Sequence, residues 1–200
     1  MSPLISTTDL AARLGAPDLR IVDGSWHLDG RDARADFEQA QVPGAVFFDL
    51  DAISDHDSPL PHMMPTPKAF GAAVGTLGLS VDDQIVVYDT AGLFSAARVW
   101  WMLKTMGAKR VQVLDGGLPR WRDEGLPTVS GPSAAEAKDF NAEMAPDAVA
   151  SLDDVRAAFD QETQVVDARG APRFKGAAPE PRAGVRSGHM PSALSLPYGR

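Results

Sequence analysis

The sequence Gln84-Ile85-Val86-Val87-Tyr88-Asp89 is a continuous apolar run that ends at a carboxylate. A run of this kind, without polar alternation, is typical of a strand buried on both faces of a parallel sheet. A second strand is predicted over 110–115, and the helix predicted between the two, over 95–106, carries Val99 and Leu103 one turn apart. Strand, helix and strand in this order predict a right-handed crossover and a parallel sheet covered by helices.

Further elements are predicted on both sides of this unit from helix caps, apolar spacing and glycine stops. Ser6 and Asp9 have the spacing of a capping box, and Thr66-Pro67 has the pattern of an N-cap followed by proline at the first helical position. The other predicted elements are a helix over 6–14, a strand over 20–24, a helix over 66–78 and a short helix that contains Trp121. The expected fold class is α/β, with functional residues in the loops after the strands.

The composition is that of a folded, acidic protein. The 200 residues include 19 Lys and Arg against 27 Asp and Glu, for a net charge of −8, and 44% are hydrophobic. A surface of this charge repels polyanions, which excludes a general nucleic-acid binder. No signal-peptide pattern or membrane-length apolar run is present, so we expect no membrane partner and a cytoplasmic location. There is no cysteine and the four histidines lack metal-ligand spacing, so we expect no metal site.

A change of composition divides the chain. Residues 126–147 are rich in proline, glycine and small or charged residues, with little periodicity. Such a segment is typical of a linker. The sequence therefore predicts a first domain over 1–125, a linker over 126–147 and a second domain over 148–200.

The second part of the chain is similar to the beginning of the first. Ser151-x-x-Asp154 repeats Ser6-x-x-Asp9, and the residues 189–193 match 41–45 further on. These matches indicate an internal duplication. The second copy reaches Arg200 before any counterpart of the strand at 84–89, so we expect residues 148–200 to be an incomplete copy of the first domain.

Two arginines in the second part are candidate binding residues. Arg173 and Arg182 lie in a stretch stiffened by Pro179 and Pro181, which lowers the entropy cost of directing two guanidinium groups at one anion. A small carboxylate or oxyanion would suit the pair. The alternative is that both are solvated loop arginines paired with nearby carboxylates, Glu180 or Asp167, and spacing alone favours this alternative.

A histidine and an aspartate in the first part are candidates for acid–base chemistry. His62 lies in a proline-bracketed loop, and Asp51 lies upstream at the end of an apolar segment. A carboxylate that orients an imidazole is the usual support for a general acid or base. The alternative is an unrelated loop histidine and capping aspartate, and because both are common, sequence alone favours this alternative. His189 is expected to bond to neighbouring backbone, and the sequence identifies no partner for His27 or His56.

Several motifs occur together along the chain. They are Asp51, His62-Met63, residues 93–102, residues 114–118 with Trp121, residues 166–169, Arg173-Phe174, residues 179–182 and residues 188–191. In this order they resemble the tandem-domain sulfurtransferases of the rhodanese superfamily, and within it the branch that uses 3-mercaptopyruvate. The resemblance covers essentially the whole chain.

The resemblance implies a rhodanese-like parallel sheet in each of two domains, of which only the second is catalytic. It implies a relay in which sulfur passes from 3-mercaptopyruvate to a cysteine persulfide, releasing pyruvate, and then to a thiol acceptor such as thioredoxin or to cyanide. Arg173 and Arg182 would bind the donor carboxylate, and Asp51 and His62 would assist proton movement at the catalytic cysteine. No cofactor is implied.

The chain departs from the family pattern because it has no cysteine. The equivalent loop of the first domain, Asp89-Thr90-Ala91-Gly92, offers a carboxylate and a hydroxyl, neither of which forms a persulfide. We therefore expect the catalytic loop to lie beyond Arg200 and this chain alone to be inactive. Two alternatives are a sulfurtransferase that uses thiosulfate and a catalytically silent module that binds a partner or an anion.

Overall fold

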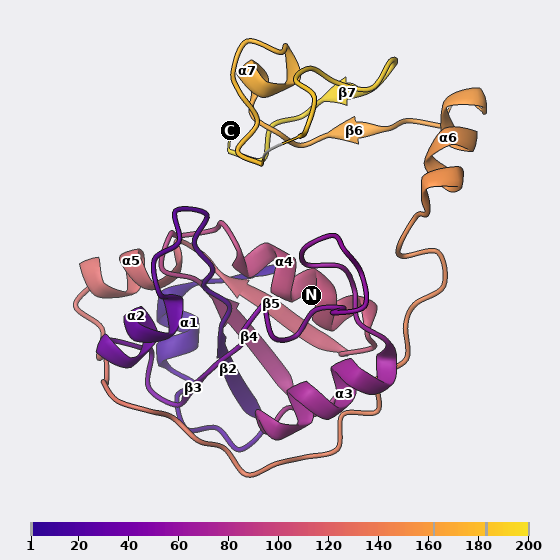
Figure 1. Cartoon of the computed structure of the whole chain (residues 1–200). Coiled ribbons are helices and arrows are strands. Elements are labelled where there is room, and N and C mark those ends of the chain that lie inside the picture. The colour runs from indigo at the N-terminus through magenta and orange to yellow at the C-terminus, as the bar shows by residue number, and fades with distance from the viewer. Residues whose placement is uncertain (1, 162, 183, 200) are drawn as a thin grey trace. The chain divides into compact units, whose positions relative to one another are not determined.

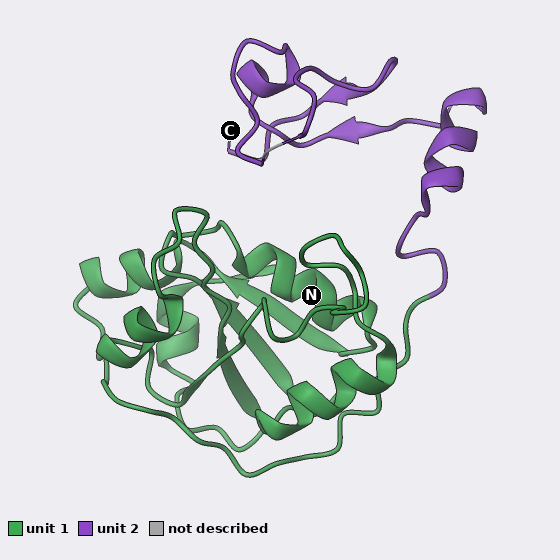
Figure 2. Ribbon diagram, in the orientation of Figure 1, with its two compact units in different colours: residues 1–145 green, residues 146–200 purple. Residues whose placement is uncertain are grey.

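The computed structural model describes residues 2–161, 163–182 and 184–199. The chain divides into two compact units, Met1–Ala145 and Pro146–Arg200 (Figure 2). Each unit has its own strands, and the two sheets are separate.

The first unit is built on a parallel sheet with β4 at its centre. The strand order is β1-β5-β4-β2-β3, and every neighbouring pair is parallel (Figure 1). The strands are β1 (Leu4–Ile5), β2 (Leu19–Asp23), β3 (Ala45–Phe47), β4 (Gln84–Tyr88) and β5 (Arg110–Leu114). The expected parallel α/β architecture is confirmed.

Both faces of β4 are buried, as the apolar run predicts. Ile85 and Val87 belong to one apolar cluster, while Val86 and Tyr88 belong to another. Alternate residues of a strand point to opposite faces, so each cluster is the core on one side of the sheet. The position of β4 between two layers of helices explains why its sequence shows no polar alternation.

Helices cover both faces. The first cluster includes residues of α3 (Pro67–Thr76) and α4 (Ala96–Thr105). The second includes residues of α1 (Thr7–Ala11), α2 (Ala33–Gln39) and α5 (Gly117–Asp123). The predicted caps form, since the Ser6 hydroxyl accepts from the Asp9 N–H at 3.1 Å and the Thr66 hydroxyl accepts from the Ala69 N–H at 3.3 Å.

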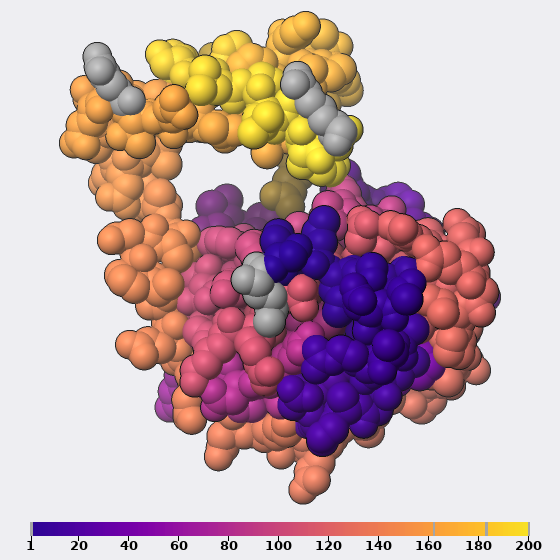
Figure 3. All heavy atoms as spheres, turned by 180° about the vertical axis from the view of Figure 1, so that it is seen from behind, coloured from indigo at the N-terminus to yellow at the C-terminus, as the bar shows by residue number. Residues whose placement is uncertain are grey.

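The N-terminal segment closes one edge of this sheet. Val113 N–H donates to the Pro3 carbonyl at 2.8 Å, and Asp115 N–H donates to the Ile5 carbonyl at 2.9 Å. The residues nearest the N-terminus, in indigo, form one patch on the face of the first unit that Figure 3 shows. In the part of the chain that the structure describes, no helix has the length and apolar character needed to span a bilayer.

Most of the segment expected to be a linker packs on the first unit instead. Val129 forms an antiparallel bridge with Gln41, and Phe140 is buried in edge contact with Phe70. Lys138 forms an ion pair with the buried Asp83 at 2.8 Å. The expected boundary at residue 125 therefore differs from the compact unit, which extends to Ala145. Burial of an aromatic ring and a paired charge holds residues 126–145, here called the strap, against the first unit, although the composition of the strap is that of a linker.

The second unit contains α6 (Leu152–Asp160), β6 (Val166–Asp167), α7 (Ala171–Phe174) and β7 (Leu194–Ser195). The two strands pair in parallel. The element order, helix, strand, helix and strand, is the same as that of α1, β2, α2 and β3. Ser151 and Asp154 form a complete capping box at the start of α6, as their spacing predicts.

Candidate functional site

The loops after β2, β3 and β4 lie at the same edge of the first sheet, because parallel strands end together. Asp23 ends β2 and is fully buried. Its Oδ1 accepts from the Ser25 N–H at 2.8 Å, while its buried Oδ2 has no hydrogen-bond partner in the described part of the chain. Burial, with a smaller contribution from nearby Asp89, raises the pKa of Asp23 to about 6.

The loop after β4 closes around its own carboxylate. The side chain of Asp89 is buried and accepts five backbone N–H groups at 2.6 to 3.1 Å, those of Ala91, Gly92, Leu93, Phe94 and Ala96. Backbone N–H groups that converge in this way form an anion-binding nest. In the first unit this nest is filled by Asp89, so the loop has no room for another anion.

The structure brings Asp51 and His62 together. His62 Nε2 lies 2.7 Å from Asp51 Oδ1. An ionised carboxylate only accepts hydrogen bonds, so Nε2 carries a proton and Nδ1 is the basic nitrogen of the neutral ring. The side chain of His62 is 17% exposed and that of Asp51 is 71% exposed, so the pair lies at the surface with its imidazole largely enclosed. The contact that sequence alone could not establish is present.

Two further residues contact this pair, and the sequence analysis missed both as site residues. Trp26, in the loop after β2, donates its indole N–H to Asp51 Oδ2 at 3.2 Å and contacts the imidazole edge-on. Arg98, in α4, donates to the carbonyl of His62 at 2.6 Å. The position of Trp26 just after the carboxyl end of a strand was the one available signal for it.

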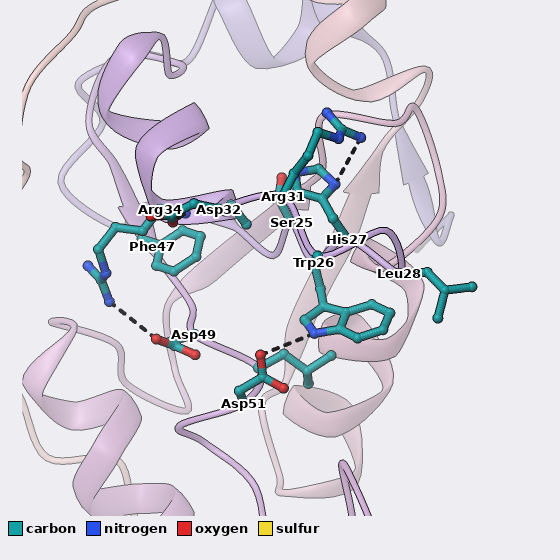
Figure 4. Close-up of a pocket in the computed structure, with 13 residues that line it drawn as sticks. Ser25, Trp26, His27, Leu28, Arg31, Asp32, Arg34, Phe47, Asp49 and Asp51 are labelled. Carbon is teal, nitrogen blue, oxygen red and sulfur yellow. Dashed lines mark hydrogen bonds and ion pairs between the residues drawn. The ribbon is translucent and has the colours of Figure 1, made fainter. Parts of the chain in front are cut away.

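A pocket of about 560 Å³ opens beside Trp26 and Asp51 (Figure 4). Its other charged lining residues come from the loop that leads into α2, from that helix and, at Asp49, from the loop after β3. Arg31 and Arg34 are both paired there, Arg31 with neighbouring aspartates and Arg34 with Asp49 at 3.5 Å. Because each guanidinium has a carboxylate partner, the pocket offers no excess of positive charge.

The remaining histidines have structural contacts. His27 Nε2 lies 2.9 Å from Asp36, and His56 Nε2 lies 3.1 Å from the Ala52 carbonyl, two partners that the sequence did not identify. His189 Nδ1 lies 2.8 Å from the Phe174 carbonyl, a backbone group 15 residues away instead of the neighbouring backbone expected, and the two rings stack with centroids 3.7 Å apart.

The arginines of the second unit have different surroundings. Arg173 lies in the short helix α7, not in a loop as expected, and its guanidinium pairs with Glu180. This pairing is the one that the alternative interpretation anticipated. Arg182 is exposed and makes no ion pair or hydrogen bond with any residue that the structure describes.

A third arginine, Arg169, links two carboxylates of the second unit. It pairs with Asp167 and, at 2.8 Å, with Glu180. Its hydrogen bonds lower the pKa of Asp167 to about 2. Arg169 and Arg173 therefore balance the charges of Asp167 and Glu180, and in the described part of the chain no hydrogen bond or ion pair joins Arg182 to this group.

Comparisons with known proteins place this arrangement in a family. The Rhodanese-like domain family matches residues 6–124. The 3-mercaptopyruvate sulfurtransferase of Mus musculus is 43% identical over 204 residues, which are 98% of this chain and 69% of that protein. The mitochondrial thiosulfate/3-mercaptopyruvate sulfurtransferase 1 of Arabidopsis thaliana is also 43% identical, over 98% of this chain and 58% of its own length.

A solved structure gives the same result. The crystal structure of the Escherichia coli 3-mercaptopyruvate sulfotransferase SseA matches with a TM-score of 0.90 and 38% identity, covering 98% of this chain and 75% of that one. The present chain thus spans 58% to 69% of the length of the two curated relatives named above. Its sequence and its parallel sheet show that the chain belongs to the rhodanese-like domain family.

Proposed function

We propose that this chain is part of a sulfurtransferase that uses 3-mercaptopyruvate and a cysteine persulfide. The cysteine has to come from outside these 200 residues, because they contain none. In this proposal residues 148–200 are the first part of the catalytic domain, and the first unit is its non-catalytic partner. The relatives' names, which give this donor for several proteins about 42% to 43% identical, support the assignment.

The proposed reaction needs one proton transfer in its first half. A cysteine thiolate attacks the donor sulfur, so that an S–S bond forms and the donor C–S bond breaks. The electron pair of that bond goes to carbon, and the resulting pyruvate enolate takes up the proton released by the donor thiol. In the second half the terminal sulfur passes to a thiol, giving an acceptor persulfide, or to cyanide, giving thiocyanate, and the cysteine thiolate is restored.

The contact between Asp51 and His62 is the observation that carries the proposal. Asp51 fixes the proton on Nε2, which leaves Nδ1 to take the thiol proton and return it to the enolate carbon. In the described part of the chain Nδ1 has no hydrogen-bond partner, so the nitrogen is available. A histidine oriented by a carboxylate is the group that this proton transfer requires.

Arg182 is the residue that we assign to the donor carboxylate. Its charge is uncompensated by the carboxylates Asp167 and Glu180, which already hold Arg169 and Arg173. Arg173 then acts as the second, partly neutralised donor of the pair. A monoanion such as 3-mercaptopyruvate balances the remaining charge, and a bidentate guanidinium–carboxylate contact fixes its orientation.

Steady-state kinetics of the longest protein expressed from the gene test this assignment. Arg182→Ala removes a charge-assisted hydrogen bond, so KM for 3-mercaptopyruvate should rise about tenfold or more while kcat changes little. Arg186→Ala, at another exposed arginine of the same unit, is the matched control. Unchanged kinetics for Arg182→Ala would remove this residue from its assigned role.

The same variants distinguish 3-mercaptopyruvate from thiosulfate as the sulfur donor. Thiosulfate is a second candidate because the Arabidopsis relative and a rat relative carry that donor in their names. Thiosulfate has no carboxylate, so a loss confined to 3-mercaptopyruvate supports the proposed donor. A wild-type protein that turns over thiosulfate alone contradicts it.

A further inference from the structure

The histidine of the proposed site is held in an unusual backbone conformation. His62 has φ of 59°, in the left-handed region that non-glycine residues seldom adopt. It lies in the segment between β3 and α3, which forms turns and no helix or strand. Within this loop Asp55 N–H donates to the Met63 carbonyl at 2.9 Å, but no helix or strand holds His62 itself, so contacts from other elements also define the position of the imidazole.

Arg98 supplies the first of these contacts. Its guanidinium donates to the His62 carbonyl at 2.6 Å and lies over the ring of Trp101, 4.6 Å from the centroid. The group is partly buried, and burial lowers its pKa from the ordinary value. Its Nε is buried and has no hydrogen-bond partner among the described residues. The contact with His62 thus fixes a desolvated cation against the loop backbone.

Trp26 supplies the second contact, and it acts on both members of the pair. Its indole N–H donates to Asp51 Oδ2 at 3.2 Å, on the oxygen that His62 does not use. Its ring meets the imidazole nearly perpendicularly, with centroids 4.9 Å apart and planes at 81°. Both carboxylate oxygens of Asp51 are therefore engaged, and the imidazole plane is set by the indole.

One turn of α4 connects the two contacts. Ser95, at the N-cap of α4, does not cap its own helix; its hydroxyl accepts from the backbone N–H of Trp26 at 3.0 Å. Arg98 follows within the same turn. The start of α4 thus positions the loop after β2 through Ser95 and the loop after β3 through Arg98.

We propose that Trp26 and Arg98 are positioning residues that hold the imidazole of His62 in one orientation and one tautomer against Asp51. Trp26 does so through the carboxylate and the ring plane, and Arg98 does so through the backbone. The catalytic meaning of this inference rests on the proposed function. The geometric claim is independent of it, and it concerns residues of the first unit alone.

Nitrogen NMR of the imidazole in this chain tests the claim without any turnover. At alkaline pH the neutral ring of His62 should show a protonated Nε2 and an unprotonated Nδ1, with widely separated ¹⁵N shifts. Trp26→Phe keeps the aromatic packing and removes the donor to Asp51. In this variant the two shifts should move toward each other, because the ring then samples both tautomers.

Arg98 is tested by a pair of variants. Arg98→Met keeps the apolar stem and removes the donor, so it should have the same effect on the His62 shifts. Arg98→Lys restores a donor and should return them toward the wild-type values. Trp100→Phe is the matched control, because its indole donates to the Val111 carbonyl and, in the described part of the chain, does not contact Asp51 or His62.

The outcomes test the positioning of His62 and the proposed function separately. If the ¹⁵N shifts of His62 in both Trp26→Phe and Arg98→Met were the same as in the wild type, the inference would be overturned. An equally large change of these shifts in Trp100→Phe would also overturn it. A folded backbone spectrum of each variant shows that the change is local. Failure of the wild-type enzyme to release pyruvate would count against the proposed function and would leave the NMR result unaffected.

Discussion

Asp23 gives a prediction that can be worked out in numbers. Its carboxyl group is buried at the end of β2, and one of its oxygens has no hydrogen-bond partner among the described residues. Burial raises its pKa from 3.8 to about 6. The perturbation is Asp23→Asn, which keeps the shape of the side chain and removes its titration.

The direction of the pH effect on the free energy of unfolding follows from proton binding. Because the folded-state pKa is the higher one, the folded protein binds more protons than the unfolded chain between pH 3.8 and about 6. The stability that Asp23 contributes is therefore present below this range, falls as pH rises through it and levels off above it. The difference between the two pKa values corresponds to about 3 kcal/mol, of which about 2 kcal/mol falls between about pH 4 and pH 7.

Urea unfolding at several pH values measures this effect. The free energy of unfolding of Asp23→Asn should increase relative to wild type by about 2 kcal/mol as the pH is raised from about 4 to 7. Asp57→Asn, at an exposed aspartate, is the control for the loss of one surface charge. Parallel stability curves for wild type and Asp23→Asn would refute the assignment of a penalty to the buried carboxylate.

Two stability predictions concern other parts of the first unit. Asp89→Asn places an amide against backbone N–H groups, including those of Phe94 and Ala96, so urea unfolding should show a loss of about 2 kcal/mol or more. An unchanged midpoint would show that the nest does not need a carboxylate. Gly75→Ala should destabilise, because the added Cβ would lie 2.5 Å from the Lys138 carbonyl of the strap. If the strap were loose, the same change would instead stabilise α3 by about 1 kcal/mol.

The elements that the sequence predicted are those with strong local signals. The apolar run of β4, the cap at Thr66 and the spacing in α4 each specify an element without reference to the rest of the chain. The helix α2 was not predicted, since Phe37 is its only buried residue and gives no periodicity. The strands β1 and β3 are two and three residues long, too short to show a pattern.

Composition misled the prediction for residues 126–147. A strap and a linker share the same small, polar and proline-rich character, because neither forms helices or strands. Phe140 and Lys138 are the residues that decide between them, since one buries its ring in the core and the other reaches Asp83. Those partners lie more than fifty residues away in sequence, so no local pattern reveals them.

Only part of the candidate site could be predicted, because its contacts also join residues that are distant in sequence. Asp51 and His62 were identified as candidates by residue type and by the resemblance, but their contact depends on the path of an irregular loop. Trp26 and Arg98 come from different elements and meet only in the folded unit. Arg173 has the partner that local spacing suggested, because Glu180 is close to it in sequence.

Whether His62 takes part in sulfur transfer is measured by the turnover of His62→Gln in the longest protein expressed from the gene, as pyruvate released from 3-mercaptopyruvate. If His62 moves the proton, kcat should fall about a hundredfold or more, while KM changes little. A kcat within about twofold of wild type would contradict the account, because the contact between Asp51 and His62 would then have no part in sulfur transfer.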